Sequence, residues 1–295
     1  MSLQTFALIG FGEAGSILGA DLAAAGRTVA MYDILLDASA SRERMLERAL
    51  RVHVRPANTF AEAVVGAEVV ISAVTASSSA DVAAQAAKSL RPGQVLLDIN
   101  SVSPAKKRSN AALLEAAGVD YVEAAVMAPV PPERLRVPML LGGKRAPALA
   151  EELRALGMNT TSLSDQIGVA SAVKMCRSIV IKGLEALTVE SMLAARRFGA
   201  EREVLESLNS TFASMGWTGK LPDYLVSRVA EHGRRRAAEM REVARTLEDA
   251  HVEPTMALAT AARQDWLIDA MAAKGVSYSS LSAPFSWREL VDALS

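Results

Sequence analysis

The sequence predicts an α/β domain with a doubly wound, mostly parallel sheet, followed by an all-helical domain. Short apolar runs alternate with helix-like stretches through the first half of the 295 residues, which is the order typical of a parallel sheet. Several runs are apolar at every position, as expected when helices cover both faces of the sheet. After about residue 165, alanine-rich helical periodicity continues without a convincing strand. The length also favours two domains.

The domains are expected at residues 1–164 and 165–295, joined by a long helix that begins near Gly168. In the first domain, apolar runs predict strands at residues 6–9, 29–32, 52–54, 69–74, 95–99, 121–126 and 138–142. Helices are expected between them at residues 60–65, 81–90 and 104–117. Glycines and prolines divide the second domain into helices near residues 168–198, 201–215, 222–248 and 254–273.

The composition argues against several kinds of partner. The formal net charge is −1, so neither nucleic acid nor an anionic membrane is expected to bind. The single cysteine, Cys176, cannot form an internal disulfide, and the three histidines lack a metal-ligand spacing, so no metal is expected. The N-terminal segment has no signal-peptide pattern, and no apolar run approaches the roughly 18 residues of a membrane span. We therefore expect a cytoplasmic protein.

A glycine pattern follows the first predicted strand and indicates a dinucleotide site. It is the run Gly10-Phe11-Gly12-Glu13-Ala14-Gly15, and the second strand ends at Asp33, 23 positions after Gly10. The first glycine permits a tight turn, the second lets pyrophosphate approach the backbone, and the third lets the helix pack closely on the strand. The helix N-terminus favours phosphate. The alternative is an ordinary glycine-rich turn.

Asp33 favours NAD as the cofactor. Its carboxylate can accept hydrogen bonds from the ribose hydroxyls of the adenosine and would repel the 2′-phosphate of NADP. Arg42 and Arg44 are close in sequence and could bind that phosphate, so NADP is possible.

Lys174 is the charged residue most suggestive of catalysis. It is expected two turns into a helix whose first residues are small, and Ser178 shares its helical face. Burial among apolar groups would lower the proton affinity of the amine and suit it to acid–base chemistry. The alternative is a solvated lysine on the helix surface.

The whole chain resembles the β-hydroxyacid dehydrogenase superfamily, which includes 3-hydroxyisobutyrate and 6-phosphogluconate dehydrogenases, in a branch with a helical C-terminal domain of unknown function. Besides the glycine pattern, residues 98–104 resemble D-x-S-T-x-x-P, residues 123–129 align with D-x-P-V-S-G-G, and residues 168–174 align with G-x-G-x-x-x-K. The resemblance implies that Lys174 is the catalytic acid–base group and that Ser178 hydrogen-bonds the same substrate oxygen. It also implies that Val74, Thr75 and Ser101 line the nicotinamide side, and that the helical domain forms a homodimer. Ser101 has an alternative role as a helix cap before Pro104.

The chain departs from the family pattern where substrate is expected to bind. Met127, Ala128 and Pro129 replace the serine and two glycines that usually hold a substrate carboxylate, and Pro129 has no N–H. Met127 instead offers an apolar wall suited to a bulkier or aromatic group. An anionic group would need another partner, with His232, Arg235 or Arg236 as weak candidates. The alternative is that Met127 only packs beneath the cofactor.

These features predict an NAD(P)-dependent dehydrogenase that moves a hydride between nicotinamide and a hydroxyl or carbonyl carbon of a small molecule. The substrate is expected to be β-hydroxyacid-like or a bulkier alcohol. Three alternatives stay open. A decarboxylating dehydrogenase usually has a glutamate where this chain has Ile181, and an imine reductase usually lacks the lysine. A non-catalytic dinucleotide sensor would need no base.

Overall fold

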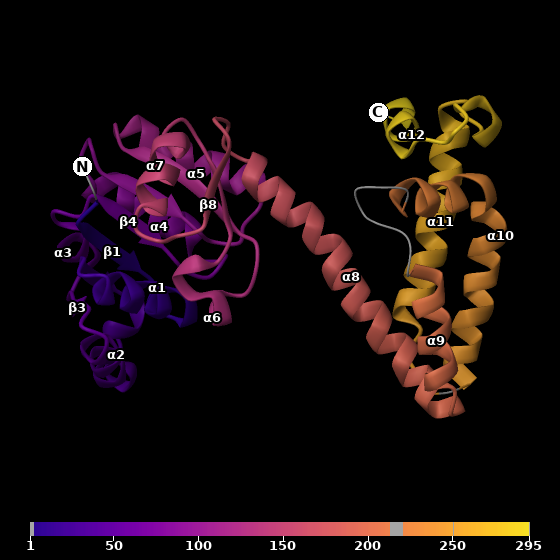
Figure 1. The fold of residues 1–295 in the computed structure, drawn as a ribbon, viewed down its shortest axis with the longest axis horizontal. Coiled ribbons are helices and arrows are strands. Elements are labelled where there is room, and N and C mark those ends of the chain that lie inside the picture. The colour runs from indigo at the N-terminus through magenta and orange to yellow at the C-terminus, as the bar shows by residue number, and fades with distance from the viewer. Residues whose placement is uncertain (1–2, 213–220, 250, 295) are drawn as a thin grey trace. The chain divides into compact units, whose positions relative to one another are not determined.

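The computed structural model describes residues 3–212, 221–249 and 251–294 of the chain (Figure 1). They belong to two compact units, residues 1–179 and 180–295. The division falls within a helix of 30 residues, α8 (Val169–Phe198).

The first unit is built on one eight-stranded sheet with the order β3-β2-β1-β4-β5-β6-β7-β8. All neighbouring strands are parallel except β6 and β7, so the expected doubly wound, mostly parallel sheet is confirmed. The strands are β1 (Thr5–Ile9), β2 (Thr28–Tyr32), β3 (Arg55–Pro56), β4 (Val69–Ser72), β5 (Val95–Asp98), β6 (Asp120–Val126), β7 (Met139–Gly142) and β8 (Thr160–Ser164).

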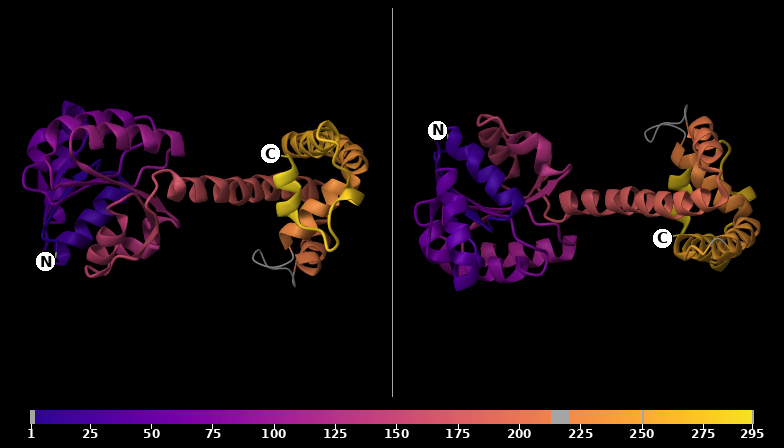
Figure 2. Two further views of the ribbon diagram at one scale, coloured as in Figure 1. Left: turned by 90° about the horizontal axis from the view of Figure 1, so that it is seen from above. Right: turned by 90° about the horizontal axis from the view of Figure 1, so that it is seen from below.

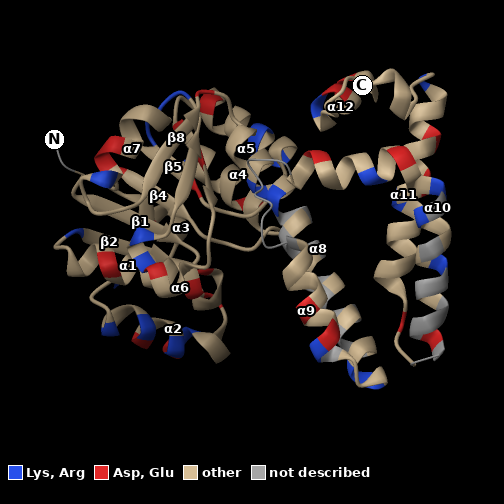
Figure 3. Ribbon diagram, turned by 45° about the vertical axis from the view of Figure 1, so that its right-hand side comes forward, with Lys and Arg blue, Asp and Glu red and all other residues tan. Residues whose placement is uncertain are grey.

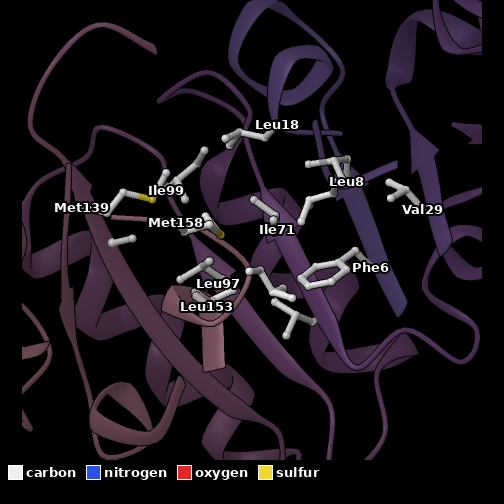
Figure 4. Packing of buried hydrophobic residues seen from close by; sticks show 14 of the residues in the cluster. Phe6, Leu8, Leu18, Val29, Ile71, Leu97, Ile99, Met139, Leu153 and Met158 are labelled. Atoms are coloured by element: carbon white, nitrogen blue, oxygen red, sulfur yellow. The ribbon is translucent and has the colours of Figure 1, made fainter. Parts of the chain in front are cut away.

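Helices cover both faces of this sheet (Figure 2). One face packs against α1 (Glu13–Ala24), α2 (Ser39–Arg51) and α7 (Ala146–Arg154), and the other against α3 (Phe60–Val64), α4 (Ser79–Ser89) and α5 (Pro104–Ala116). Alternate strand residues enter the two cores, so Leu8 joins the first and Ile9 the second. Figure 4 shows Leu18 of α1 near Leu8 and Ile71 of the central strands. Burial of both faces explains why these strands are continuous apolar runs.

The sheet differs from the prediction at two strands, one that was expected elsewhere and one that was not expected. The run at residues 52–54 is not a strand, because His53 takes a left-handed φ of 57° as the chain leaves α2, and pairing begins only at Arg55. Strand β8 was not predicted because its sequence, Thr-Thr-Ser-Leu-Ser, is polar and lies at the edge of the sheet. An edge strand needs no continuous apolar run.

The second unit contains α9 (Glu201–Phe212), α10 (Leu221–Asp249), α11 (Thr255–Ala273) and α12 (Trp287–Leu294). Helices α10 and α11 approach closely at Gly233, where a Cβ would lie 2.6 Å from Cγ1 of Ile268. Arg234 forms ion pairs with Asp265 and Asp269 of α11, and Arg241 pairs with Asp265 at 2.5 Å. Basic and acidic positions lie along both helices (Figure 3). Ion pairs between exposed side chains therefore connect α10 and α11.

Among the residues that the structure describes, no helix is both long and apolar enough to cross a membrane.

Candidate functional site

The candidate site lies where four parallel strands, β1, β4, β5 and β6, end at the same edge of the sheet. The loops that follow them contain the glycine pattern and the residues predicted to lie beside the nicotinamide or the substrate. In open α/β sheets, ligands bind outside the carboxyl ends of the strands. A cavity of about 410 Å³ opens here, lined among others by Gly10, Gly12, Asp33, Val74 and Thr75.

The glycine loop leaves room for a phosphate group against the backbone. Gly10 has a φ of +88°, and a Cβ there would lie 2.5 Å from the carbonyl oxygen of Ala73. At Gly15 a Cβ would lie 2.1 Å from the carbonyl oxygen of Gly10, so α1 can begin this close to β1 only with glycine. Gly12, the N-cap of α1, has no heavy atom within 4 Å of its Cβ position. The helix N-terminus and the open surface at Gly12 together fit the pyrophosphate of a dinucleotide.

The rest of the glycine run is arranged around this opening. Phe11 is fully buried, whereas Glu13 and Ala14 form the first turn of α1, with Glu13 exposed. The carboxylate of Asp33 accepts hydrogen bonds from the N–H of Phe11 at 2.6 Å and of Leu35 at 3.0 Å. Asp33 is therefore held beside the glycine loop, where a ribose would lie.

The cavity carries negative rather than positive side chains. Asp81, at the start of α4, lines it together with Asp33, and no lysine or arginine does so in the described ranges. Arg42 is engaged elsewhere, since it donates to the carbonyl oxygen of Leu36 and to Asn58, both at 2.7 Å. A carboxylate pair without a cation favours a free ribose hydroxyl over a phosphate.

Lys174 contacts the loop that follows β5. Its Nζ donates a hydrogen bond to Oγ of Ser101 at 2.7 Å, and its side chain is half-buried. Ser101 is not the cap of α5, because Ser103 fills that role by accepting from the N–H of Lys106. Both predicted residues thus lie together within the first unit. Ser178 is in α8, but its side chain lies outside the described residues.

The start of α8 is anchored by Glu123 of β6, which is 1% exposed. Its Oε1 accepts hydrogen bonds from the N–H groups of Gly168 at 2.6 Å and Ala170 at 3.1 Å. A carboxylate at a helix N-terminus satisfies N–H groups that have no partner within the helix and interacts favourably with the helix dipole. Glu123 therefore fixes the first turn of the helix that carries Lys174.

A buried ion pair lies under the loop after β5. Lys107 Nζ is 2.9 Å from Oδ1 of Asp98 and donates to the Asp98 carbonyl oxygen at 2.7 Å, while the Tyr121 hydroxyl donates to Oδ2 at 2.6 Å. Burial lowers the pKa of Lys107, and the two nearby carboxylates oppose that shift. Burial and the Asp98 charge raise the pKa of Tyr121. Sequence reasoning did not find this cluster, although an acid ending an apolar strand was a usable signal.

The predicted substrate residues follow β6. Met127 and Ala128 are half-buried and Pro129 is exposed. The N–H of Met127 donates to the carbonyl oxygen of Pro138 at 2.8 Å, so this backbone group already has a partner within the fold.

His232 belongs to the second unit, where it interrupts α10 with φ −128° and lines a cavity of about 530 Å³. Its Nε2 is 3.4 Å from Oε2 of Glu231.

Comparison with known proteins agrees with this architecture. Residues 5–151 match the NAD binding domain of 6-phosphogluconate dehydrogenase, and residues 195–267 match a domain of unknown function, DUF1932. An uncharacterised 28.5 kDa protein of Methanothermus fervidus is 28% identical over 217 residues, covering 72% of this chain and 81% of that one.

Solved structures are also similar. A conserved hypothetical protein of Sinorhizobium meliloti 1021 is 36% identical, with 99% of this chain and 96% of that one covered and a TM-score of 0.62. A conserved protein described as structurally similar to 3-hydroxyacid dehydrogenases is 31% identical, with coverage of 88% and 96% and a TM-score of 0.59. An imine reductase from Myxococcus stipitatus in complex with NADP+ shares the fold at 20% identity, with coverage of 99% and 100% and a TM-score of 0.71.

Proposed function

Because the chain belongs to the family that joins the NAD-binding domain of 6-phosphogluconate dehydrogenase to a DUF1932 domain, we propose that it is an NAD-dependent dehydrogenase. It would transfer a hydride between nicotinamide and a hydroxyl or carbonyl carbon, with Lys174 as general acid and base. One observation carries this proposal. Lys174 reaches Ser101 at 2.7 Å, in a loop at the same sheet edge as the glycine pattern.

The glycine loop and Asp33 would hold the dinucleotide, with Val74, Thr75 and Ser101 on the nicotinamide side. The bound nicotinamide would accept or supply the hydride. Lys174 would take the hydroxyl proton during oxidation and return it to the carbonyl oxygen during reduction. Ser101 accepts a hydrogen bond from Nζ and so orients the amine. We propose that Ser178 hydrogen-bonds the same substrate oxygen.

The residues after β6 favour a substrate larger than a simple 3-hydroxy acid. A carboxylate cradle needs donors, but Pro129 has no N–H and the N–H of Met127 is engaged with Pro138. A carboxylate placed there would be poorly satisfied in a dehydrated site. The thioether of Met127 would instead contact an apolar or aromatic group. His232 remains a proposed contact for a polar substrate group.

Two other reactions of this fold family are oxidative decarboxylation and imine reduction. A decarboxylating dehydrogenase usually has a glutamate where this chain has Ile181. Imine reductases share the fold, so imines belong in any substrate test. Lys174 favours alcohol chemistry, because an imine reductase on this fold usually lacks the lysine. Localisation of the protein to the cytoplasm is a prediction from the sequence.

Cofactor preference should follow the two carboxylates of the cavity. We expect NADH to bind at least about tenfold more tightly than NADPH, because the 2′-phosphate would meet Asp33 and Asp81. Asp33→Asn should reduce this preference. Asp37→Asn, which neutralises a carboxylate paired with the Tyr32 hydroxyl, should leave it unchanged. Fluorescence titration measures the affinities of the three proteins for NADH and NADPH, and equal wild-type affinities would contradict the assignment.

Replacing the proposed acid–base group should separate binding from turnover. Lys174→Met should retain NADH affinity and fold but lose roughly 10²- to 10⁴-fold in kcat, the usual effect of removing a general acid or base. Lys144→Met is the control, since that side chain is 86% exposed and its ion pair with Glu115 is long, at 3.7 Å. A Lys174→Met enzyme with wild-type turnover would make Lys174 a surface lysine. NADH binding by a wild-type protein that turns over nothing would favour a sensor.

Substrate size should decide between the two interpretations of Met127. We expect larger or aryl-substituted alcohols to give higher kcat/KM than 3-hydroxyisobutyrate, serine or 3-hydroxypropionate. Steady-state kinetics with NAD on this panel, and with NADH on cyclic imines, makes the comparison. Efficient turnover of the small acids, unmatched by any larger compound, would contradict the proposed pocket. Turnover of imines alone would replace the alcohol assignment.

The second unit is proposed to form a homodimer. Leu205 and Leu208 of α9 are 53% and 45% exposed and lie three residues apart on one helical face, which a second copy could cover. Light scattering at micromolar concentration should give twice the mass of 31.2 kDa. Leu208→Lys should shift the protein toward monomer, whereas Leu50→Lys, at an exposed position of α2, should not. A monomeric wild-type protein would contradict this proposal.

A further inference from the structure

Asn100 links two loops of the candidate site through one buried side chain. It lies two residues after the end of β5 and is 5% exposed. Its Oδ1 accepts a hydrogen bond from the N–H of Val74 at 2.7 Å, and its Nδ2 donates to Oγ of Ser72 at 2.8 Å. One amide thus connects the loop after β5 to the end of β4 and to the loop that follows it.

The backbone of Asn100 is itself held by the buried ion pair. Its N–H donates to Oδ1 of Asp98 at 2.9 Å, and the same oxygen pairs with Lys107. The Tyr121 hydroxyl occupies the other carboxylate oxygen. Rotation of the Asp98 carboxylate would break several buried bonds at once, so Asn100 has a fixed support.

Each of the two loops that Asn100 connects also contacts a residue of the proposed site. On one side, Cγ1 of Val74 lies 2.8 Å from where a Cβ on Gly10 would be, so the loop after β4 packs directly on the glycine loop. Val74 also lines the cavity beside Gly10. On the other side, the next residue is Ser101, which accepts the hydrogen bond from Lys174.

An asparagine side chain suits this position because it offers an acceptor and a donor on one rigid group. The pattern D-x-S-T-x-x-P has serine here, and a serine hydroxyl on a shorter side chain cannot span the same two partners. Alanine would leave the Val74 N–H without its acceptor in a buried setting, which is costly. The chemistry of the link therefore depends on the amide.

We propose that Asn100 is a positioning residue that sets the loop after β4 against the glycine loop and holds Ser101 in reach of Lys174. This inference rests on the proposed function for its reference to a dinucleotide. The link between Val74 and Asn100 can be tested without a ligand.

The experiment compares Asn100→Ala and Asn100→Ser with Asn110→Ala in the full chain. Asn110 is a matched control, since it is 2% exposed and in the same cluster, but it donates to Ser79 at 3.0 Å and to Asp98 rather than accepting from Val74. Losing a buried hydrogen-bond partner should weaken NADH binding about tenfold in the Asn100 variants and less than about twofold in Asn110→Ala. Fluorescence titration gives the affinities, and circular dichroism confirms folding. If Asn100→Ala does not fold, the comparison is made with Asn100→Ser.

A second readout follows the amide of Val74 directly. In ¹⁵N-labelled protein without ligand, this amide should exchange with solvent faster in the Asn100 variants than in wild type or Asn110→Ala. Equal exchange, or equal loss of NADH affinity in the Asn100 and Asn110 variants, would overturn the positioning role. Failure of the wild-type protein to bind NADH would refute the proposed function, whereas the exchange result would stand by itself.

Discussion

The ion pair between Asp98 and Lys107 is the interaction on which the rest of the site depends. Both side chains are almost completely buried, at 2% and 1% exposed, so neither charge is stabilised by water. Removing one partner of such a pair leaves a buried charge without compensation, at a cost of about 3–5 kcal/mol. Burial lowers the pKa of Lys107 although the charge of Asp98 opposes that shift, so the attraction between the two groups does not fully offset the desolvation. The buried pair of Asp98 and Lys107 therefore fixes the start of the loop after β5.

A second buried carboxylate lies beside the first. Asp98 of β5 and Glu123 of β6 are register partners in the sheet, and like charges at such positions repel unless other groups compensate. Lys107 and the Tyr121 hydroxyl satisfy one carboxylate, and backbone N–H groups at the start of α8 contact the other. The two carboxylates therefore hold different parts of the site. One supports the loop that contains Ser101, and the other supports the helix that carries the proposed base.

The sequence predicted the parts of the fold that depend on local patterns. Apolar runs located most strands, and the glycine spacing located the dinucleotide loop. The partners of Asp98 and Asn100 could not be predicted, because Tyr121 reaches Asp98 across 23 residues and Asn100 reaches Ser72 across 28. Lys107 also follows another lysine, and helical periodicity does not reveal which of two adjacent cations is buried. Polar strand β8 was missed for the same reason, since its place is set by pairing with β7.

The two ends of the site differ in what determines their specificity. At the glycine loop, the close approach of backbone to backbone leaves no room for a side chain at Gly10 or Gly15, so the sequence pattern itself indicates the ligand. Beyond β6, the backbone N–H of Met127 is engaged with the carbonyl oxygen of Pro138, so the proposed substrate contacts there come from side chains. A side-chain pocket can change its ligand through a single substitution without altering the fold. The cofactor class therefore follows from the chain's pattern, whereas the proposed substrate depends on which groups Met127 and its neighbours would exclude.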